Sequence, residues 1–83
     1  MILINQNNKD MEAIYNIEEG KNLKRYYYAA VSDGVNCGFV GYDGLMHCGS
    51  PEMIAARFKT KQEARDAAEY CPDMVNYKII HVE

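Results

Sequence analysis

Apolar residues in the middle of this chain occur in strand-like runs that are interrupted by two Asp-Gly steps. Asp33-Gly34 and Asp43-Gly44 lie on either side of residues 35–42, and apolar residues lead into the first step and out of the second. An Asp-Gly pair between such runs is the strongest short-range hairpin signal, because a type I′ turn needs φ > 0 at both central residues. The pattern therefore predicts three antiparallel strands joined by two-residue turns.

The C-terminal third shows the period of a helix and then that of a strand. Thr60 and Glu63 have the spacing of a capping box, which satisfies two backbone N–H groups at the start of a helix. We expect this helix to end at about Tyr70 or Cys71, because Pro72 disfavours the helical conformation in the residue before it. Residues 77–82 then alternate as in a strand that pairs within the sheet. Small and apolar residues mark one side of the helix at i, i+3, i+4 and i+7: Ala64, Ala67, Ala68 and Cys71.

The first twenty residues have a more ambiguous pattern. Residues 2–5 fit a short strand, and residues 7–10 are rich in turn formers. Residues 11–17 alternate as in a strand, but some of them also have helical spacing, with Gly20 as the residue after the helix. We favour the strand, because residues 19–22 then form a hairpin turn into a strand that ends at Ser32.

Together these elements predict one α+β domain over residues 1–83. Its antiparallel meander of about four to six strands packs on one principal C-terminal helix, which a terminal strand follows. A chain of this length buries a modest core, and small domains often gain stability by dimerising or by binding a partner.

The predicted two-residue turns assign each strand residue to a face of the sheet. They pair Ser32 with Val35 and Tyr42 with Leu45, and directly opposed residues point to the same side. The first face includes an aromatic ring and two cysteines, and we expect it to form the core beneath the helix: Tyr26, Tyr28, Ala30, Val35, Cys37, Phe39, Met46 and Cys48. The second face contains no acidic residue: Arg25, Tyr27, Ala29, Val31, Asn36, Gly38, Val40, Tyr42, Leu45 and His47.

The second face has the composition of a binding surface. Tyrosine and arginine are enriched at protein interfaces, and acidic residues are depleted there. The alternative is that residues 1–20 fold across this face and bury it. The first interpretation predicts a protein partner or a homodimer, with these partner-binding residues: Arg25, Tyr27, Val40, Tyr42, Leu45 and His47.

Charge and cysteine content restrict the class of protein. The net charge of −3 makes nucleic acid an unlikely partner, although Lys21, Lys24 and Arg25 form a short basic cluster. Three cysteines without close spacing favour a reducing cytoplasm over a disulfide framework. The sequence contains neither a membrane-spanning stretch nor the pattern of a signal peptide.

No combination of residues predicts catalysis, a metal site or a cofactor. The four candidate metal ligands, Cys37, His47, Cys48 and Cys71, lack the spacing of a metal motif. A Cys48–His47 nucleophile also fails, because adjacent strand residues face opposite ways. The glycines lack the strand-loop-helix context of a phosphate site. We therefore expect a protein that is not an enzyme.

Residues 56–64, followed by a terminal strand, have an aromatic residue, a capping Thr60 and then Glu63-Ala64 opening an alanine-rich helix. This pattern resembles short uncharacterised proteins encoded by phages and prophages, among them anti-CRISPR and other anti-defence inhibitors. The resemblance covers about the last third of the chain and by itself implies no activity. Many such proteins act by binding and blocking a host or defence protein, and we expect a non-catalytic protein of this type.

Two further hypotheses compete with a protein-masking role. The first is a module that sequesters a nucleotide-like molecule with Arg25, Tyr27, Tyr42 and His47, because a base can stack on tyrosine beside a cation. The second is an accessory nucleic-acid-binding protein, which would use the basic cluster.

Overall fold

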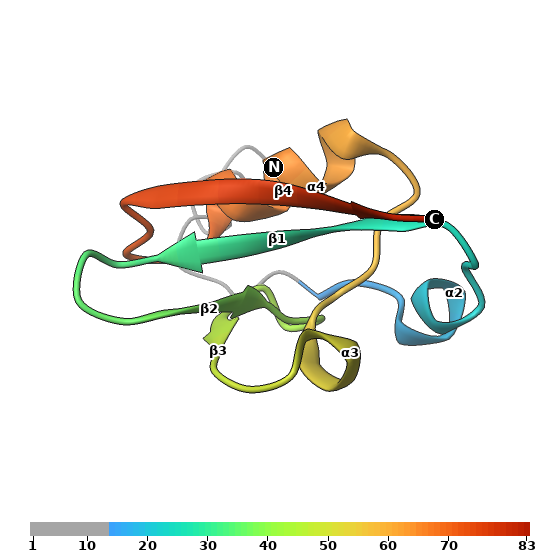
Figure 1. Ribbon diagram of the computed structural model, residues 1–83, viewed down its shortest axis with the longest axis horizontal. Helices are drawn as coiled ribbons and strands as arrows, with labels where there is room; N and C mark the ends of the chain where they lie inside the picture. The colour runs from blue at the N-terminus through green and yellow to red at the C-terminus, as the bar shows by residue number, and fades with distance from the viewer. Residues whose placement is uncertain (1–13) are drawn as a thin grey trace, which may run out of the picture.

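The computed structural model describes residues 14–83 of the chain (Figure 1). The strands and helices follow one another as α2 (Ile17–Lys21), β1 (Tyr26–Ser32), β2 (Cys37–Val40), β3 (Met46–His47), α3 (Pro51–Ile54), α4 (Lys61–Tyr70) and β4 (Asn76–Val82). Among these residues, no helix combines the length and the apolar character needed to cross a membrane. The strand expected at residues 2–5 and the turn expected at 7–10 lie outside the described residues.

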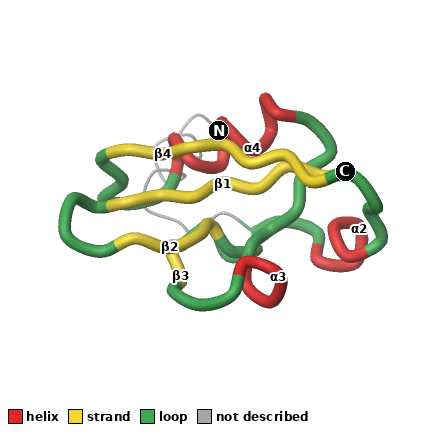
Figure 2. Tube along the Cα trace, in the orientation of Figure 1, coloured by secondary structure: helices red, strands yellow, loops and turns green. Residues whose placement is uncertain are grey.

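The strands form one antiparallel sheet in the order β3-β2-β1-β4, and α4 is the principal helix (Figure 2). This arrangement confirms the predicted α+β class with a terminal strand after the main helix. The terminal strand runs along the whole of β1, from Tyr26 opposite Val82 to Ser32 opposite Asn76. β1 and β4 therefore form the longest ladder of the sheet.

The helix α4 begins and ends where the sequence predicts. The Thr60 hydroxyl accepts a hydrogen bond from the Glu63 N–H at 3.1 Å, and the Glu63 carboxylate accepts one from the Lys59 N–H at 3.2 Å. The alanine stripe is buried, because α4 packs against β1 and β4 with these residues inward: Ala64, Ala67, Ala68 and Cys71. Side chains this small let the helix approach the sheet closely, so the core is thin.

The core lies on the side of the sheet that was predicted to bind a partner. Ala29 and Val40 have no exposed surface, and Val31 is 3% exposed. Tyr27 and Tyr42 are partly buried against the same cluster. The assignment of the two faces was therefore wrong. The physical reason is that a helix with an alanine stripe fits small sheet residues such as Ala29 and Val31, whereas Tyr26, Tyr28 and Phe39 on the other face would hold it away.

Residues 14–16 add to this cover. The Tyr15 ring meets the Phe58 ring edge-on at 5.1 Å, and the Tyr15 N–H donates to the Tyr42 carbonyl at 2.7 Å. This face is therefore covered within the chain, but its main cover is α4 and not residues 1–20, as the alternative supposed. Of the described residues among the first twenty, Tyr15 packs on Phe58 and Gly20 on Tyr42.

The turn between β1 and β2 is shifted from the predicted position. It is centred on Gly34 and Val35, and only Gly34 has a positive φ, of 94°. Asp33 precedes the turn and closes it: its carboxylate accepts from the N–H groups of Val35 at 2.9 Å and Asn36 at 2.6 Å. This shift moves the register by two residues, so that Ala30 lies opposite Phe39. A shift of two leaves every side chain on its predicted face.

The turn between β2 and β3 has three residues instead of two. Gly41 N–H donates to the Leu45 carbonyl at 2.9 Å, and Gly44 N–H donates to the Gly41 carbonyl at 3.0 Å. Gly44 has φ of 81°, as in a type I turn followed by a left-handed glycine. The extra residue shifts the register by one, which places Met46 opposite Val40 and His47 opposite Phe39. Because a shift of one reverses the faces, the predicted orientations of these two β3 side chains were wrong.

Residues 17–21 form a helix and not a strand followed by a turn. The Asn16 side chain accepts a hydrogen bond from the Glu19 N–H at 3.0 Å and so caps α2. Local capping by asparagine outweighs an alternation that is only a few residues long. Tight packing also fixes this helix, because a Cβ at Gly20 would overlap the Tyr42 ring. Of the ambiguous segment 11–17, residues 11–13 lie outside the described residues.

The connection from α3 to α4 extends the sheet. The Ala56 N–H donates to the Val40 carbonyl at 2.9 Å. Phe58 and Tyr27 exchange two backbone hydrogen bonds of 2.8 and 2.9 Å. This segment pairs with the first half of β1, because β2 is too short to extend along it.

Candidate functional site

The face of the sheet opposite α4 is its open face. Strand pairing arranges the open face in rows: Tyr26 lies beside Val82, Tyr28 beside Ile80, and Ala30 between Phe39 and Lys78. None of its residues is buried, in contrast with the covered face. Its eleven residues are Tyr26, Tyr28, Ala30 and Ser32 of β1, Cys37 and Phe39 of β2, His47 of β3, and Asn76, Lys78, Ile80 and Val82 of β4.

Aromatic rings cluster at one end of the open face. The Tyr28 and Phe39 rings meet edge-on at 5.5 Å, and the Tyr26 and Tyr28 rings lie 6.5 Å apart in a tilted arrangement. The Arg57 guanidinium lies 4.5 Å from the centre of the Tyr26 ring, a cation–π distance. Because these groups pack on one another, the cluster is held in place before any partner arrives.

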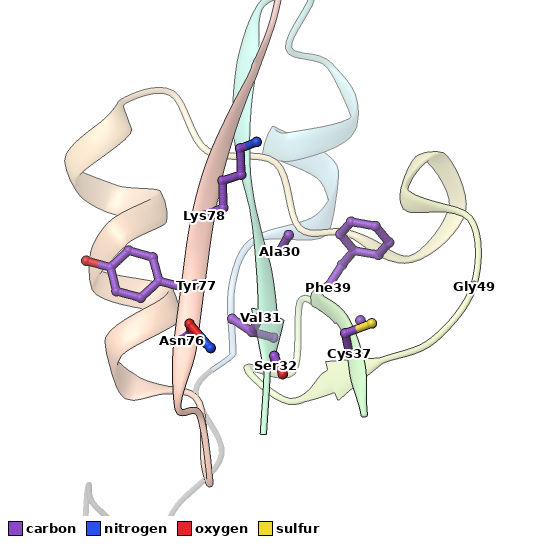
Figure 3. Close-up of a pocket in the computed structure, with 10 residues that line it drawn as sticks. Ala30, Val31, Ser32, Cys37, Phe39, Gly49, Asn76, Tyr77 and Lys78 are labelled. Carbon is purple, nitrogen blue, oxygen red and sulfur yellow. The ribbon is translucent and has the colours of Figure 1, made fainter. Parts of the chain in front are cut away.

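A hollow of about 510 Å³ lies at the other end of the open face, above Ala30. Figure 3 shows Phe39 on one side of this hollow and Lys78 on the other, while Tyr77 points away toward α4. Ser32, Asn76 and the exposed Cys37 complete its polar end. The open face therefore passes from an aromatic and aliphatic region to a polar one within a few residues of each strand.

The charge of the open face has the opposite sign to that of the whole chain. None of its eleven residues is acidic, and it contains Lys78 and borders Arg57. Asp43 lies at its β3 end, where its carboxylate is paired with His47. The chain as a whole has a net charge of −3. This face would therefore attract apolar groups with acidic groups beside them.

The partner-binding residues predicted from the sequence do not form one surface. Val40 has no exposed surface, and Tyr27 and Tyr42 pack against the core. The Tyr42 hydroxyl accepts a hydrogen bond from the Arg57 N–H at 3.2 Å. Arg25 is exposed, and Leu45 and His47 belong to the β2–β3 turn and to β3. The nucleotide site proposed from Arg25, Tyr27, Tyr42 and His47 is therefore not assembled.

The open face contains residues that the sequence interpretation placed in the core or did not consider. Tyr26, Tyr28 and Phe39 were expected beneath the helix, and Arg57 and Lys78 were not considered. One signal could have identified them: the alanine stripe of the helix requires small sheet residues, and Ala29 and Gly38 alternate onto the same face. The large aromatic residues of these strands are then left on the opposite side.

The cysteines and histidine considered for catalysis and metal binding have other surroundings. His47 Nε2 lies 2.9 Å from the Asp43 carboxylate. Partial burial acts to raise the pKa of Asp43, but the hydrogen bond from the Leu45 N–H and the contact with His47 lower the pKa below its ordinary value. The Cys48 thiol donates to the Cys37 carbonyl at 3.2 Å, and burial raises the pKa of Cys71. Within residues 14–83, no three metal-ligating side chains come together.

Comparison with known proteins finds no matching family model, no matching curated protein and no matching solved structure.

Proposed function

We propose that this chain is a small non-catalytic binding protein that masks another protein by means of its open face. The observation that supports the proposal is a sheet face that no helix of residues 14–83 covers, with a packed aromatic cluster flanked by cations and no acidic residue at its strand positions. Tyrosine and arginine are the side chains that most often dominate the binding energy of protein interfaces. The phage-type resemblance supports the same role, with a host or defence protein such as a CRISPR effector as the target.

The geometry of the aromatic cluster favours a protein partner over single-stranded nucleic acid. A base stacks on the free face of an aromatic ring. Here Arg57 covers a face of the Tyr26 ring, and Tyr28 and Phe39 are packed edge to face. The acidic chain also supplies only one lysine to the open face, whereas nucleic-acid affinity depends mainly on several phosphate contacts.

The experiment compares three tagged variants expressed in cells of the source organism: Tyr28→Glu, Phe39→Glu and Tyr70→Glu. Tyr70 is 72% exposed on α4, so it provides a matched control on the opposite side of the molecule. We expect quantitative mass spectrometry to show one protein captured by the wild type and by Tyr70→Glu, and lost with both open-face variants. With the purified partner, the open-face substitutions should weaken binding at least about tenfold, as for interface hot spots.

Two controls define the outcome. Each variant must retain a cooperative thermal transition, because Tyr28 and Phe39 are partly buried. Equal capture of the same proteins by all three folded variants would show that the open face is not the binding surface.

The hollow above Ala30 supports a second candidate function, the binding of a small anionic ligand. Its volume of about 510 Å³ lies in the range of ligand sites, and Phe39 and Lys78 provide an apolar wall and a cation. Native mass spectrometry of protein purified from its source cells would then show a retained small molecule that Lys78→Glu loses. Protein that carries no bound molecule in this measurement and shows no thermal shift across a panel of nucleotides would exclude this candidate.

A further inference from the structure

The outer edge of β4 is a long, regular strand edge. All seven residues of β4 pair in register with β1, without a bulge, and the strand contains neither proline nor glycine. Lys78 is its only lysine or acidic residue. Within residues 14–83, β1 is the only segment that pairs with β4. Proteins usually protect such edges with short strands, prolines, bulges or several charges, because an unprotected edge recruits another strand.

The hydrogen bonds of β1 show which backbone groups of β4 point outward. Tyr27 uses both its N–H and its C=O to bind Phe58, on the side away from β4. Backbone groups of a strand alternate between its two sides, so Tyr26 and Tyr28 direct theirs toward β4. The Ser32 carbonyl follows the same alternation, because it accepts from the Val75 N–H, just before β4, at 2.8 Å.

The pairing of β1 with β4 shows which residues of β4 direct their backbone groups toward β1. Asn76, Lys78, Ile80 and Val82 lie opposite the residues of β1 that point toward β4, so they form the hydrogen-bonded pairs. The N–H and C=O groups that remain on the outer edge are those of three alternate residues: Tyr77, Ile79 and His81.

This outer edge is complementary to itself. If two copies of β4 pair antiparallel about a two-fold axis at Ile79, Tyr77 of each copy exchanges both hydrogen bonds with His81 of the other. The two Ile79 residues also exchange both bonds, so every outward backbone group of the three residues has a partner. A shift by two residues would instead place one of the three opposite a residue outside β4, either Val75 or Glu83. Only the register centred on Ile79 pairs all three within β4.

The side chains are compatible with this register. Lys78 lies opposite Ile80 of the other copy, and Asn76 lies opposite Val82, so no two lysines face each other directly. The two β1 strands would be three strand spacings apart, or about 14 Å. Because α4 packs mainly on β1, this separation exceeds the 8–10 Å at which helix axes pack, so the two helices do not collide.

We infer that β4 pairs with β4 of a second copy about a two-fold axis at Ile79, joining the two sheets into one of eight strands. The occupant of the edge is a second copy of this chain, because the edge is self-complementary and a two-fold interface uses the same surface twice. The pairing joins the two open faces side by side and buries neither, so dimerisation and partner binding can be tested separately.

The first experiment uses the wild-type full chain. Light scattering over a concentration series should show a species of twice the 9.5 kDa chain mass. Amide hydrogen exchange should then show an alternating pattern. Lys78 and Ile80 are protected at every concentration by β1, whereas Tyr77, Ile79 and His81 gain protection as the dimer forms.

The second experiment changes one outward N–H group. His81→Pro removes that donor, whereas His81→Ala retains it, and both remove the stacking of His81 on Tyr27 at 4.2 Å. Proline is tolerated on a strand edge where the N–H faces outward. We expect His81→Pro to weaken dimerisation at least about tenfold relative to His81→Ala, because both symmetry-related bonds are lost.

Three results would overturn the inference. One is a 9.5 kDa species at every concentration, whether or not its three outer amides are protected. Another is a dimer in which those amides exchange freely. The last is equal dimerisation of folded His81→Pro and His81→Ala.

Discussion

Replacing Val40 with alanine tests which face of the sheet forms the core. Val40 has no exposed surface, and it belongs to the same buried cluster as Ala29, Val31 and the alanine stripe of α4. Val35 at the tip of the first turn is 89% exposed and provides a matched control for the same chemical change. The two valines therefore differ mainly in burial.

The expected loss follows from the two methyl groups removed. At about 0.8 kcal/mol for each buried carbon, the lost transfer free energy is about 1.6 kcal/mol. The cavity left behind adds to this loss, because a thin core between a helix and a sheet collapses only partly, which gives about 2–3 kcal/mol in the free energy of unfolding. In a domain of this size the midpoint temperature should fall by roughly 10–20 °C. Val35→Ala should change stability by no more than about 0.5 kcal/mol.

Thermal and urea unfolding, followed by circular dichroism, measure both variants under the same conditions. The expected loss in the free energy of unfolding depends on the burial of Val40. A Val40→Ala protein as stable as Val35→Ala would therefore refute the placement of the core on this face. It would instead favour a core beneath Tyr28 and Phe39.

Further predictions concern a close backbone contact, a helix cap, an acidic side chain and a buried thiol. Gly38→Ala should cost about 1–3 kcal/mol, because its Cβ would overlap the His47 backbone, with the carbonyl carbon at 2.8 Å; wild-type stability would contradict the β2–β3 register. Thr60→Ala should cost about 1 kcal/mol in chemical unfolding and Thr60→Ser much less, since only alanine loses the hydroxyl bound to Glu63 N–H. Hydrogen bonds from the Asn36 and Val35 N–H groups lower the pKa of Asp33 below its ordinary 3.8, so its contribution is complete above that pH and is lost as the pH falls through the folded-state value. Between about pH 5 and pH 3, the free energy of unfolding should therefore fall less for Asp33→Asn than for the wild type, which unfolding measured at several pH values would show. Burial raises the pKa of Cys71, so a thiol reagent should modify Cys37 and Cys48 in the folded protein and Cys71 only on unfolding; rapid native labelling of all three would argue against the buried site.

Short-range signals predicted the elements whose formation depends on neighbouring residues. The capping box of Thr60 and Glu63, the alanine stripe and Pro72 define α4 because hydrogen bonds and backbone sterics act within a few residues. The Asp-Gly steps located both turns for the same reason, since Gly34 and Gly44 each take a positive φ. α2 was missed because the capping by Asn16 was not considered.

The candidate site could not be predicted in the same way. Its residues depend on which side of the sheet α4 covers, and both sides of β1 are rich in apolar residues. The sequence interpretation placed the face of Tyr28 and Phe39 in the core because it also holds two cysteines, which are usually buried. The structure buries Ala29, Val31 and Val40 instead, in one cluster with the alanine stripe of α4.

The sequence by itself determined the α+β class, the limits of the main helix, the terminal strand and the approximate positions of both turns. Each of these follows from local backbone preferences and from periodicity. Only the tertiary structure decided the exact position of the first turn, the length of the second, the face that α4 covers and the sheet edge that β4 forms. One added residue in a turn reverses the faces of the next strand, and the choice of a covered face depends on how helix and sheet fit together. Those long-range contacts place Tyr26, Tyr28 and Phe39 on the open face, and they leave the outer backbone groups of β4 without a strand partner within residues 14–83.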